Sequence, residues 1–336
     1  MNNVMKRTVG SSGIEVTAVG MGCWAIGGPF WAGDTPLGYS GSDDAESART
    51  IEAAWAQGVR VFDTAAVYGA GHSEELLGQV LGNRAGSVVV SKFGPVFDRE
   101  TRQVIRDDAG PDAIRASTEA SLARLRRERI DVLLCHINTL PVDAVPEVFD
   151  TLEALRGAGK IGSYGWSTDF PERLDAAAGW PGFAGVEYTM NLFFDAPSQH
   201  AMAERHGLQQ LIRSPLAMGL LTGKFAAGQQ VAKDDIRANT FDWLDYFKDG
   251  RVSDGLVAKL DAVRELLTAG GRTLGQGALG WLLAKSPALI PVPGAKTVAQ
   301  AEENAAAMAL GPLPAGVTDE IEALIDRPPE GPARER

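Results

Sequence analysis

The sequence predicts an α/β protein whose strands close into a (β/α)8 TIM barrel, and three observations support this fold class. Short apolar runs rich in β-branched residues alternate with longer amphipathic segments, a pattern typical of βαβ units and a parallel sheet. Eight such runs occur within 336 residues, a usual length for this barrel as a single domain, 1–336. A doubly wound sheet is the alternative, but it would normally carry a GxGxxG turn after an early strand, and no glycine cluster here has that spacing and context.

The expected strands are short apolar runs bounded by turn residues or charge. They are Val19–Cys23, Val59–Asp63, Val88–Lys92, Val132–His136, Gly162–Ser167, Gly185–Tyr188, Leu208–Arg213 and Leu289–Pro293. The expected helices have an apolar face at helical spacing and end at breakers such as glycine. They are Asp44–Gln57, Glu74–Leu81, Asp112–Arg126, Val142–Arg156, Gln199–His206, Asp254–Leu267, Leu274–Ala284 and Val298–Met308.

Two long segments interrupt the alternation of strands and helices. Pro29–Gly41 follows the first core strand, and residues 225–250 follow the seventh; both are rich in aromatic side chains. Long loops after barrel strands usually build the substrate pocket, so we expect 225–250 to be a substrate-side insert. Packing of these aromatic rings against hydrophobic surface is an equally good interpretation of each one singly. The Arg-rich end, residues 327–336, is expected to be a disordered tail.

Composition excludes several classes of function. A formal net charge of -11 and an acidic pI argue against nucleic acid or an anionic membrane as the main partner. Cys23 and Cys135 both lie in apolar runs, which favours buried thiols over a disulfide, and neither has metal-ligand spacing, so no metal site is indicated. The first residues lack the apolar core of a signal peptide, and a cytoplasmic location is expected.

Chemically useful side chains stand at the ends of three successive expected strands. Asp63 and Tyr68 follow the second strand, Lys92 ends the third and His136 ends the fourth. Because the C-terminal ends of neighbouring barrel strands converge on one face, we expect these four groups to meet there. Each has an ordinary structural interpretation alone, such as an ion pair or a packed ring, but the coincidence of all four favours a catalytic site.

This set of residues suits proton transfer to a carbonyl oxygen. Tyrosine has a pKa of about 10 in water, and a nearby ammonium stabilises its phenolate, so Lys92 would make Tyr68 a better acid. Asp63 would keep Lys92 charged and oriented, and a ring N–H of His136 would polarise the substrate oxygen. No side chain donates hydride, so a cofactor must supply it.

Several segments together resemble the aldo-keto reductase family. FDTAAVYGAGHSEELLG (Phe62–Gly78) is similar to the family signature, D-x4-Y-G followed by S-E-x3-G. Other segments resemble further blocks of the family and follow one another in the family's order. They begin at Val19, Val88, Asp131, Arg213 and Ile290, and the resemblance runs from about Arg7 to Leu310. Within the family, these segments resemble the bacterial and potassium-channel-β-like branches. The resemblance implies the same barrel, the catalytic tetrad above, and NADP(H) bound across the barrel mouth without a Rossmann domain.

By the same resemblance, many residues would contact the cofactor. The nicotinamide end would meet Gly22, Cys23, Trp24, Asp63, Ser167, Thr168, Glu187 and Arg213. The pyrophosphate would meet Ser214, Leu216, Gly219, Leu221 and Lys224. The adenosine half would meet Gly294, Lys296, Gln300, Glu303 and Asn304. From the aromatic content of the two long loops, and not from the resemblance, the substrate is expected near Trp31 and Trp243, beside Tyr68 and His136.

Four of these positions depart from the family pattern. Thr168 stands where many members have Asn, Glu187 where Gln is usual, and Arg213 where a tyrosine often stacks on the nicotinamide. A carboxylate accepts from the carboxamide NH₂ but donates nothing to its oxygen. Gln300 replaces an arginine common at the adenosine 2′-phosphate, while Lys296 supplies a cation nearby, which favours NADPH and leaves NADH open.

The expected function is therefore that of an NAD(P)H-dependent oxidoreductase that reduces small aldehydes or ketones to alcohols. Oxidation of a sugar, polyol or inositol in the reverse direction would use the same tetrad. A regulatory subunit that binds the cofactor with little turnover is the alternative from another class, and a lyase or isomerase on the same barrel is a third. The sequence leaves open the physiological substrate and the preferred direction of the reaction. It also leaves open the oligomeric state, which could be a homo-oligomer.

Overall fold

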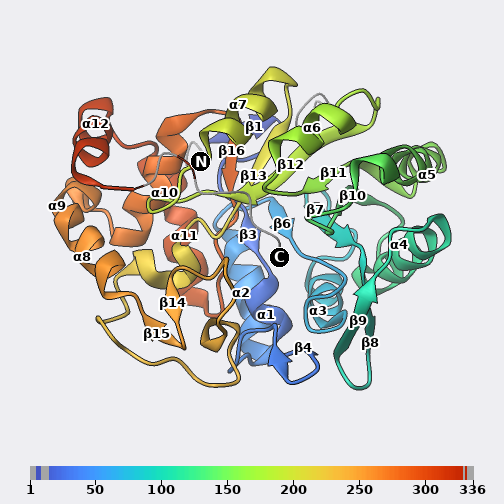
Figure 1. Cartoon of the computed structure of the whole chain (residues 1–336), viewed down its shortest axis with the longest axis horizontal. Helices are drawn as coiled ribbons and strands as arrows, with labels where there is room; N and C mark the ends of the chain where they lie inside the picture. Colours follow the sequence, from blue (N-terminus) through green and yellow to red (C-terminus); the bar gives the residue numbers. More distant parts are fainter. Residues whose placement is uncertain (1–4, 9–14, 328–329, 331–336) are drawn as a thin grey trace.

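Eight parallel strands form the centre of the molecule in the computed structural model, which describes residues 5–8, 15–327 and 330 (Figure 1). Hydrogen bonding orders them β16-β13-β12-β11-β10-β7-β6-β3. The barrel closes where the backbone N–H groups of Gly20 and Gly22 donate to the carbonyl oxygens of Pro291 and Pro293, at 2.9 and 3.0 Å. The strands are β3 (Met21–Gly22), β6 (Val61–Asp63), β7 (Val88–Phe93), β10 (Ile130–Cys135), β11 (Ile161–Ser167), β12 (Phe183–Thr189), β13 (Gln209–Arg213) and β16 (Leu289–Pro291).

Helices surround the barrel and return the chain between parallel strands (Figure 1). They are α1 (Trp24–Gly27), α2 (Asp44–Ala56), α3 (His72–Val80), α4 (Pro111–Leu125), η2 (Val142–Ala144), α5 (Val145–Gly157), α6 (Pro171–Ala177), α7 (Pro197–Arg205), α8 (Asp254–Ala262), α9 (Arg264–Leu267), η5 (Ala269–Gly271), α10 (Leu274–Lys285), α11 (Val298–Leu310) and α12 (Ala315–Leu324). All eight expected strands and all the expected helices are present within a few residues. Among the described residues, no helix combines the length and the hydropathy needed to span a bilayer.

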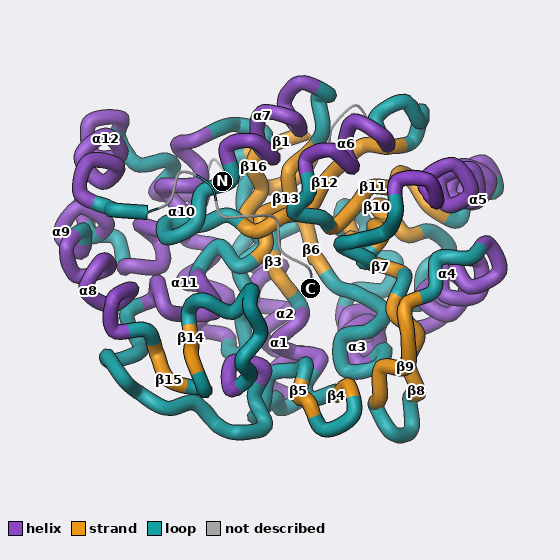
Figure 2. Tube along the Cα trace, in the orientation of Figure 1, coloured by secondary structure: helices purple, strands orange, loops and turns teal. Residues whose placement is uncertain are grey.

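The structure also differs from the sequence expectations in several places. The expected helix 254–267 is interrupted at Val263, which separates α8 from α9. Short strands form a second sheet outside the barrel, and its hairpin of β8 (Pro95–Asp98) and β9 (Gln103–Asp107) projects beyond the barrel strands (Figure 2). β9 also pairs with β4 (Trp31–Ala32), which in turn pairs with β5 (Thr35–Pro36). These strands are two to five residues long and partly exposed, so they lack the longer buried apolar runs that identified most of the barrel strands.

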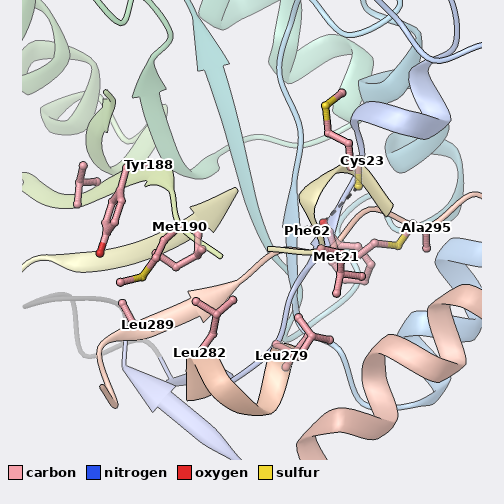
Figure 3. Packing of buried hydrophobic residues seen from close by; sticks show 14 of the residues in the cluster. Met21, Cys23, Phe62, Tyr188, Met190, Leu279, Leu282, Leu289 and Ala295 are labelled. Carbon is pink, nitrogen blue, oxygen red and sulfur yellow. Dashed lines mark hydrogen bonds between the residues drawn. The ribbon is translucent and has the colours of Figure 1, made fainter. Parts of the chain in front are cut away.

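Strand side chains alternate between two cores. Inward-facing residues such as Val61, Val90 and Val132 form a cluster inside the barrel, and Val16 of β2 (Glu15–Thr17) joins it from the N-terminal hairpin with β1 (Lys6–Thr8). Outward-facing residues pack against the helices. Figure 3 shows this outer layer, with Leu279 and Leu282 of α10 beside β16.

The two long loops meet over one end of the barrel. Residues 225–250 contain η4 (Ile236–Ala238) and β14 (Phe247–Lys248), and β14 pairs with β15 (Arg251–Val252). The N–H of Ile236 donates to the Gly38 carbonyl at 2.8 Å, and the Asn239 side chain donates to the Pro36 carbonyl at 2.6 Å. The insert therefore packs on the loop that follows β3. Of the expected tail 327–336, all but Arg327 and Glu330 lies outside the described residues.

We predict that Gly78→Ala destabilises the protein. Gly78 of α3 lies against the C-terminal end of α4, where an added Cβ would overlap the carbonyl oxygen of Arg124. Overpacking of this kind costs about 1–3 kcal/mol. The matched control is Gly316→Ala in α12, where nothing lies within 4 Å of an added Cβ and helix propensity should stabilise by about 0.5–1 kcal/mol. Urea unfolding of both variants measures the difference, and equal stabilities would contradict the packing argument.

Candidate active site

Strand alternation collects the site residues on the inner face of the barrel. Residues two apart on a strand share a face, so Asp63 follows Val61 inward, Lys92 follows Val90, and His136 continues the inward series of Val132 and Leu134. The same alternation places Ser167, Glu187 and Arg213 inward at the ends of the next three strands. All six lie at C-terminal strand ends, the face on which barrel enzymes carry their active sites.

The ammonium of Lys92 is the centre of this layer. Its Nζ lies 2.6 Å from Asp63 Oδ1, 2.9 Å from the Thr64 carbonyl oxygen and 3.5 Å from the Tyr68 hydroxyl. A second carboxylate, that of Glu187, lies 3.2 Å from Nζ through Oε2. The side chains of Lys92, Asp63 and Glu187 are 0%, 6% and 1% exposed, so these charges interact with little screening by water.

Burial and charge shift the pKa values of the three groups. Burial acts to lower the pKa of Lys92, but the charges of Asp63, Glu187 and Tyr68 outweigh it and raise that pKa, so the ammonium stays charged. Burial, and after it the charge of Glu187, raise the pKa of Asp63 against the opposing effect of Lys92. For Tyr68, burial raises the pKa above its ordinary value; Lys92 lowers it, as the sequence suggested, but does not reverse the shift.

Tyr68 is held by aromatic rings on two sides. Its ring stacks on Trp24 at 5.7 Å between centroids and meets the edge of His136 at 5.8 Å. Trp24 in turn contacts the ring of Tyr39 and donates its indole N–H to the Leu37 carbonyl at 3.1 Å. The sequence placed Tyr39 only in the first loop; its contact with Trp24 makes it part of the site's wall.

The loop that carries Tyr68 is tied to the first strand. Gly69 has a positive φ of 61°, and an added Cβ there would overlap the carbonyl oxygen of Gly27, so only glycine fits. Ser73 donates to the Cys23 carbonyl at 2.8 Å and also bonds to the Thr64 hydroxyl at 2.8 Å. These contacts explain why the glycine and serine of the signature segment accompany its tyrosine.

The residues expected at the carboxamide differ in what they contact. Ser167 donates to Glu187 Oε1 at 3.2 Å, which links this pair to Lys92. The Thr168 hydroxyl is fully buried and donates to the Asn138 carbonyl at 3.0 Å, so it fixes the loop after β11. Arg213 donates to Asp169 at 2.6 Å and to the Thr189 hydroxyl at 2.8 Å, contacts that hold its guanidinium at the end of β13.

The segment after β13 has an unusual backbone. Ser214, Ala217 and Met218 are non-glycine residues with φ near 50°, and Gly219 follows at 97°. Such left-handed conformations cost free energy and often occur at ligand sites. The segment contains η3 (Ala217–Thr222) and all the residues that the resemblance assigned to the pyrophosphate except Lys224, which follows it.

Three cations gather beyond this segment. Lys224, Lys296 and Arg237 interact electrostatically with one another, and Asp235 binds Arg237 at 2.6 and 2.8 Å. Burial, followed by the neighbouring charge of Arg237, lowers the pKa of both lysines. In the described part of the chain, no carboxylate forms a salt bridge with either lysine, and Lys296 Nζ donates to the Ser40 carbonyl at 2.5 Å. This cluster favours an anion.

Arg237 was not among the residues singled out from the sequence. It lies in the irregular loop 225–250, where no periodicity or strand end marks a functional position. Its guanidinium faces the rings of Tyr39, Phe225 and Phe247 at 5.1–5.7 Å. The nearby Asp235 also accepts from Ser40, so the same pair of residues joins the two long loops.

The remaining expected cofactor residues lie around the barrel closure and the start of α11. Gly22 bridges to Gly294, and the Cys23 N–H donates to the Asp63 carbonyl at 2.8 Å. Contacts within the chain also hold the adenosine-side residues: Gln300 accepts from the Lys296 N–H at 2.8 Å, Glu303 from the Thr273 hydroxyl at 2.6 Å, and Asn304 donates to the Gly294 carbonyl at 3.4 Å.

Two expected substrate residues lie in peripheral elements. Trp31 belongs to β4 of the outer sheet, and Trp243 stacks on Phe241 at 5.2 Å within the insert. Their contact with substrate stays a prediction, whereas Tyr68 and His136 face each other in the site.

Comparisons with known proteins support the barrel fold and identify the family. The aldo-keto reductase YhdN of Bacillus subtilis is 29% identical over 88% of this chain and 86% of its own length. The NADH-specific methylglyoxal reductase of Escherichia coli is 28% identical over 90% and 93%. The structure of the glycerol dehydrogenase from Gluconobacter oxydans superposes with a TM-score of 0.78 at 30% identity, covering 95% of this chain and 94% of that chain. The model of the aldo/keto reductase family matches residues 18–326, and the chain therefore belongs to this family.

Proposed function

We propose that this oxidoreductase reduces small aldehydes or ketones to alcohols, with Tyr68 as the proton donor. The observation that carries the proposal is the buried contact of the Tyr68 hydroxyl with an ammonium that Asp63 holds in place. A hydroxyl with a raised pKa keeps its proton through the neutral range and is available to a developing alkoxide. The ammonium lies where it stabilises the phenolate left behind.

His136 and Trp24 would confine the substrate oxygen next to Tyr68. His136 meets the tyrosine ring edge-on and Trp24 covers its face, so a carbonyl oxygen has a narrow approach to the hydroxyl. A ring N–H of His136 would donate to that oxygen as negative charge develops on it. A bound reduced nicotinamide supplies the hydride to the carbonyl carbon.

The cation cluster supports a dinucleotide with an additional phosphate. Lys224, Lys296 and Arg237 carry three positive charges against the one negative charge of Asp235, and both lysines are partly buried. Phosphate oxygens would serve as anionic partners for the two lysines. Gly41 has no side chain, and a Cβ added there would have Lys296 Nζ, at 3.9 Å, as its neighbour. We therefore propose NADPH as the preferred cofactor, with NADH as the alternative that the Escherichia coli relative uses by name.

Oxidation of an alcohol or polyol is the second candidate. The glycerol dehydrogenase similar to this chain at 30% identity carries that activity in its name. By microscopic reversibility, the phenolate of Tyr68 would then accept the alcohol proton, again beside Lys92. The ratio of the two rates at one pH, with the matching cofactor form, distinguishes the preferred direction.

Replacing Tyr68 with phenylalanine should lower kcat for carbonyl reduction by about 10²–10⁴-fold, because the proton donor is lost. Cofactor affinity, measured by fluorescence titration, should stay nearly unchanged. The control is Tyr164→Phe, which removes a hydroxyl bound to Glu153 on the outer side of the barrel and should leave turnover intact. Wild-type turnover by the Tyr68 variant would show that another group donates the proton.

Lys296→Ala should weaken NADPH binding by about tenfold or more while changing NADH binding little. The expected size follows from the loss of a charge-assisted hydrogen bond, about 1.5–3 kcal/mol. Lys160→Ala, at an exposed lysine paired with Glu119, is the control. Titration of each variant with both reduced cofactors measures the effect, and equal losses for NADPH and NADH would contradict a role at the additional phosphate.

A further inference from the structure

The buried charges around Lys92 do not balance. Its ammonium contacts two carboxylates, Asp63 Oδ1 at 2.6 Å and Glu187 Oε2 at 3.2 Å, and all three side chains are almost completely buried. With both carboxylates ionised, the cluster would carry one uncompensated negative charge. An unpaired charge in a low-dielectric interior is costly, and a site usually responds by changing its protonation.

Hydrogen-bond accounting points to the same place. The ammonium has three protons, and its partners at hydrogen-bonding geometry are Asp63, the Thr64 carbonyl and the Tyr68 hydroxyl. Glu187 Oε1 accepts from Ser167 at 3.2 Å. For Glu187 Oε2, which is buried, no donor among the described residues has hydrogen-bonding geometry. A proton held between the carboxylates would satisfy this oxygen, because both carboxylates contact the same ammonium, Asp63 at 2.6 Å and Glu187 at 3.2 Å.

We propose that Asp63 and Glu187 share one proton, and that Glu187 is a positioning residue that sets the charge Lys92 and Asp63 present to Tyr68. The shared proton makes the cluster neutral and gives Glu187 Oε2 a hydrogen bond in addition to its contact with Lys92. Its effect on turnover rests on the proposed function, whereas the proton itself is a property of the cofactor-free chain and can be detected without turnover.

The groups around this pair are few. Lys92 on β7 and Tyr68 after β6 face it directly, and the buried Cys23 thiol after β3 interacts with Asp63, its pKa raised by burial and by that carboxylate. On β11 the neighbour of Glu187 is Ser167, and on β13 its register partner is Leu211, so neither side adds a charge. His136 meets the edge of the Tyr68 ring at 5.8 Å between centroids.

The sign of the pH effect follows from the charge count. While the pair holds its proton, one net negative charge balances Lys92. When rising pH removes that proton, a second negative charge opposes formation of the Tyr68 phenolate, and Tyr68 becomes a weaker acid. Carbonyl reduction should then fall above the apparent pKa of the pair, by at most about tenfold per pH unit, towards the lower rate of the deprotonated form.

Glu187→Gln tests the proposal directly. An amide has nearly the same shape but carries no titratable proton, so Asp63 alone would balance Lys92. Infrared difference spectra of the full-length, cofactor-free protein, recorded across a pH change, should show the carbonyl band of a protonated carboxylic acid that disappears at alkaline pH. Glu187→Gln should lack this band, Glu187→Asp should keep one, and Glu204→Gln, on α7, should match the wild type. A wild-type spectrum without the band, or an unchanged band in Glu187→Gln, overturns the shared proton.

The kinetic measurement tests the positioning role. Profiles of kcat against pH for carbonyl reduction should lose their alkaline decline in Glu187→Gln and keep it in Glu204→Gln, with circular dichroism showing that both variants fold. The same alkaline decline in Glu187→Gln would overturn the link to Tyr68. If the wild type reduces no aldehyde or ketone, the proposed function fails, and the infrared comparison still decides whether the proton is shared.

Discussion

The ion pair between Lys92 and Asp63 is the interaction on which the site depends. Moving an ammonium into a barrel interior carries a desolvation penalty of several kcal/mol, and only close, well-oriented partners offset it. Asp63 at 2.6 Å and the Thr64 carbonyl at 2.9 Å supply those partners from the neighbouring strand. Removing Lys92 would leave two buried carboxylates, Asp63 and Glu187, without their counter-charge, so stability and chemistry are coupled here.

Barrel geometry explains how such a cluster assembles. Neighbouring strands end at one face, and their inward positions alternate with period two, so Asp63, Lys92 and Glu187 converge although they are far apart in the chain. The cation cluster is organised differently: Lys224 follows η3, Arg237 lies in the short helix η4, and Lys296 lies in the loop before α11. Contacts between the long loops, such as Asp235 with Ser40, hold this part together.

The sequence predicted the strands, the barrel and the convergence of the tetrad because apolar runs and strand ends are local signals. It did not predict that Glu187 contacts Lys92. The residues next to Glu187 in β12 do not indicate which side chain on another strand it will reach across the barrel. The partners of Arg213 were equally out of reach, because Asp169 and Thr189 meet it only through the register of β12 and β13. Arg237 was missed because loop residues have no periodicity, and the β8–β9 hairpin because its strands are short and partly exposed.

The charged groups on the barrel strands and those in the loops differ in how freely they can be substituted. A buried, mutually charged cluster tolerates few substitutions, because each group sets the charge state of the next. The cations Lys224, Lys296 and Arg237 lie outside this cluster, and under the proposed function a change there would alter affinity for a phosphate while leaving the contact between Lys92 and Tyr68 in place. Arg213 shares features of both groups. It lies on a barrel strand, but its guanidinium binds a loop carboxylate, that of Asp169. Replacing it would therefore remove contacts of two kinds at once, one to the loop after β11 and one to Thr189 at the end of the neighbouring strand β12.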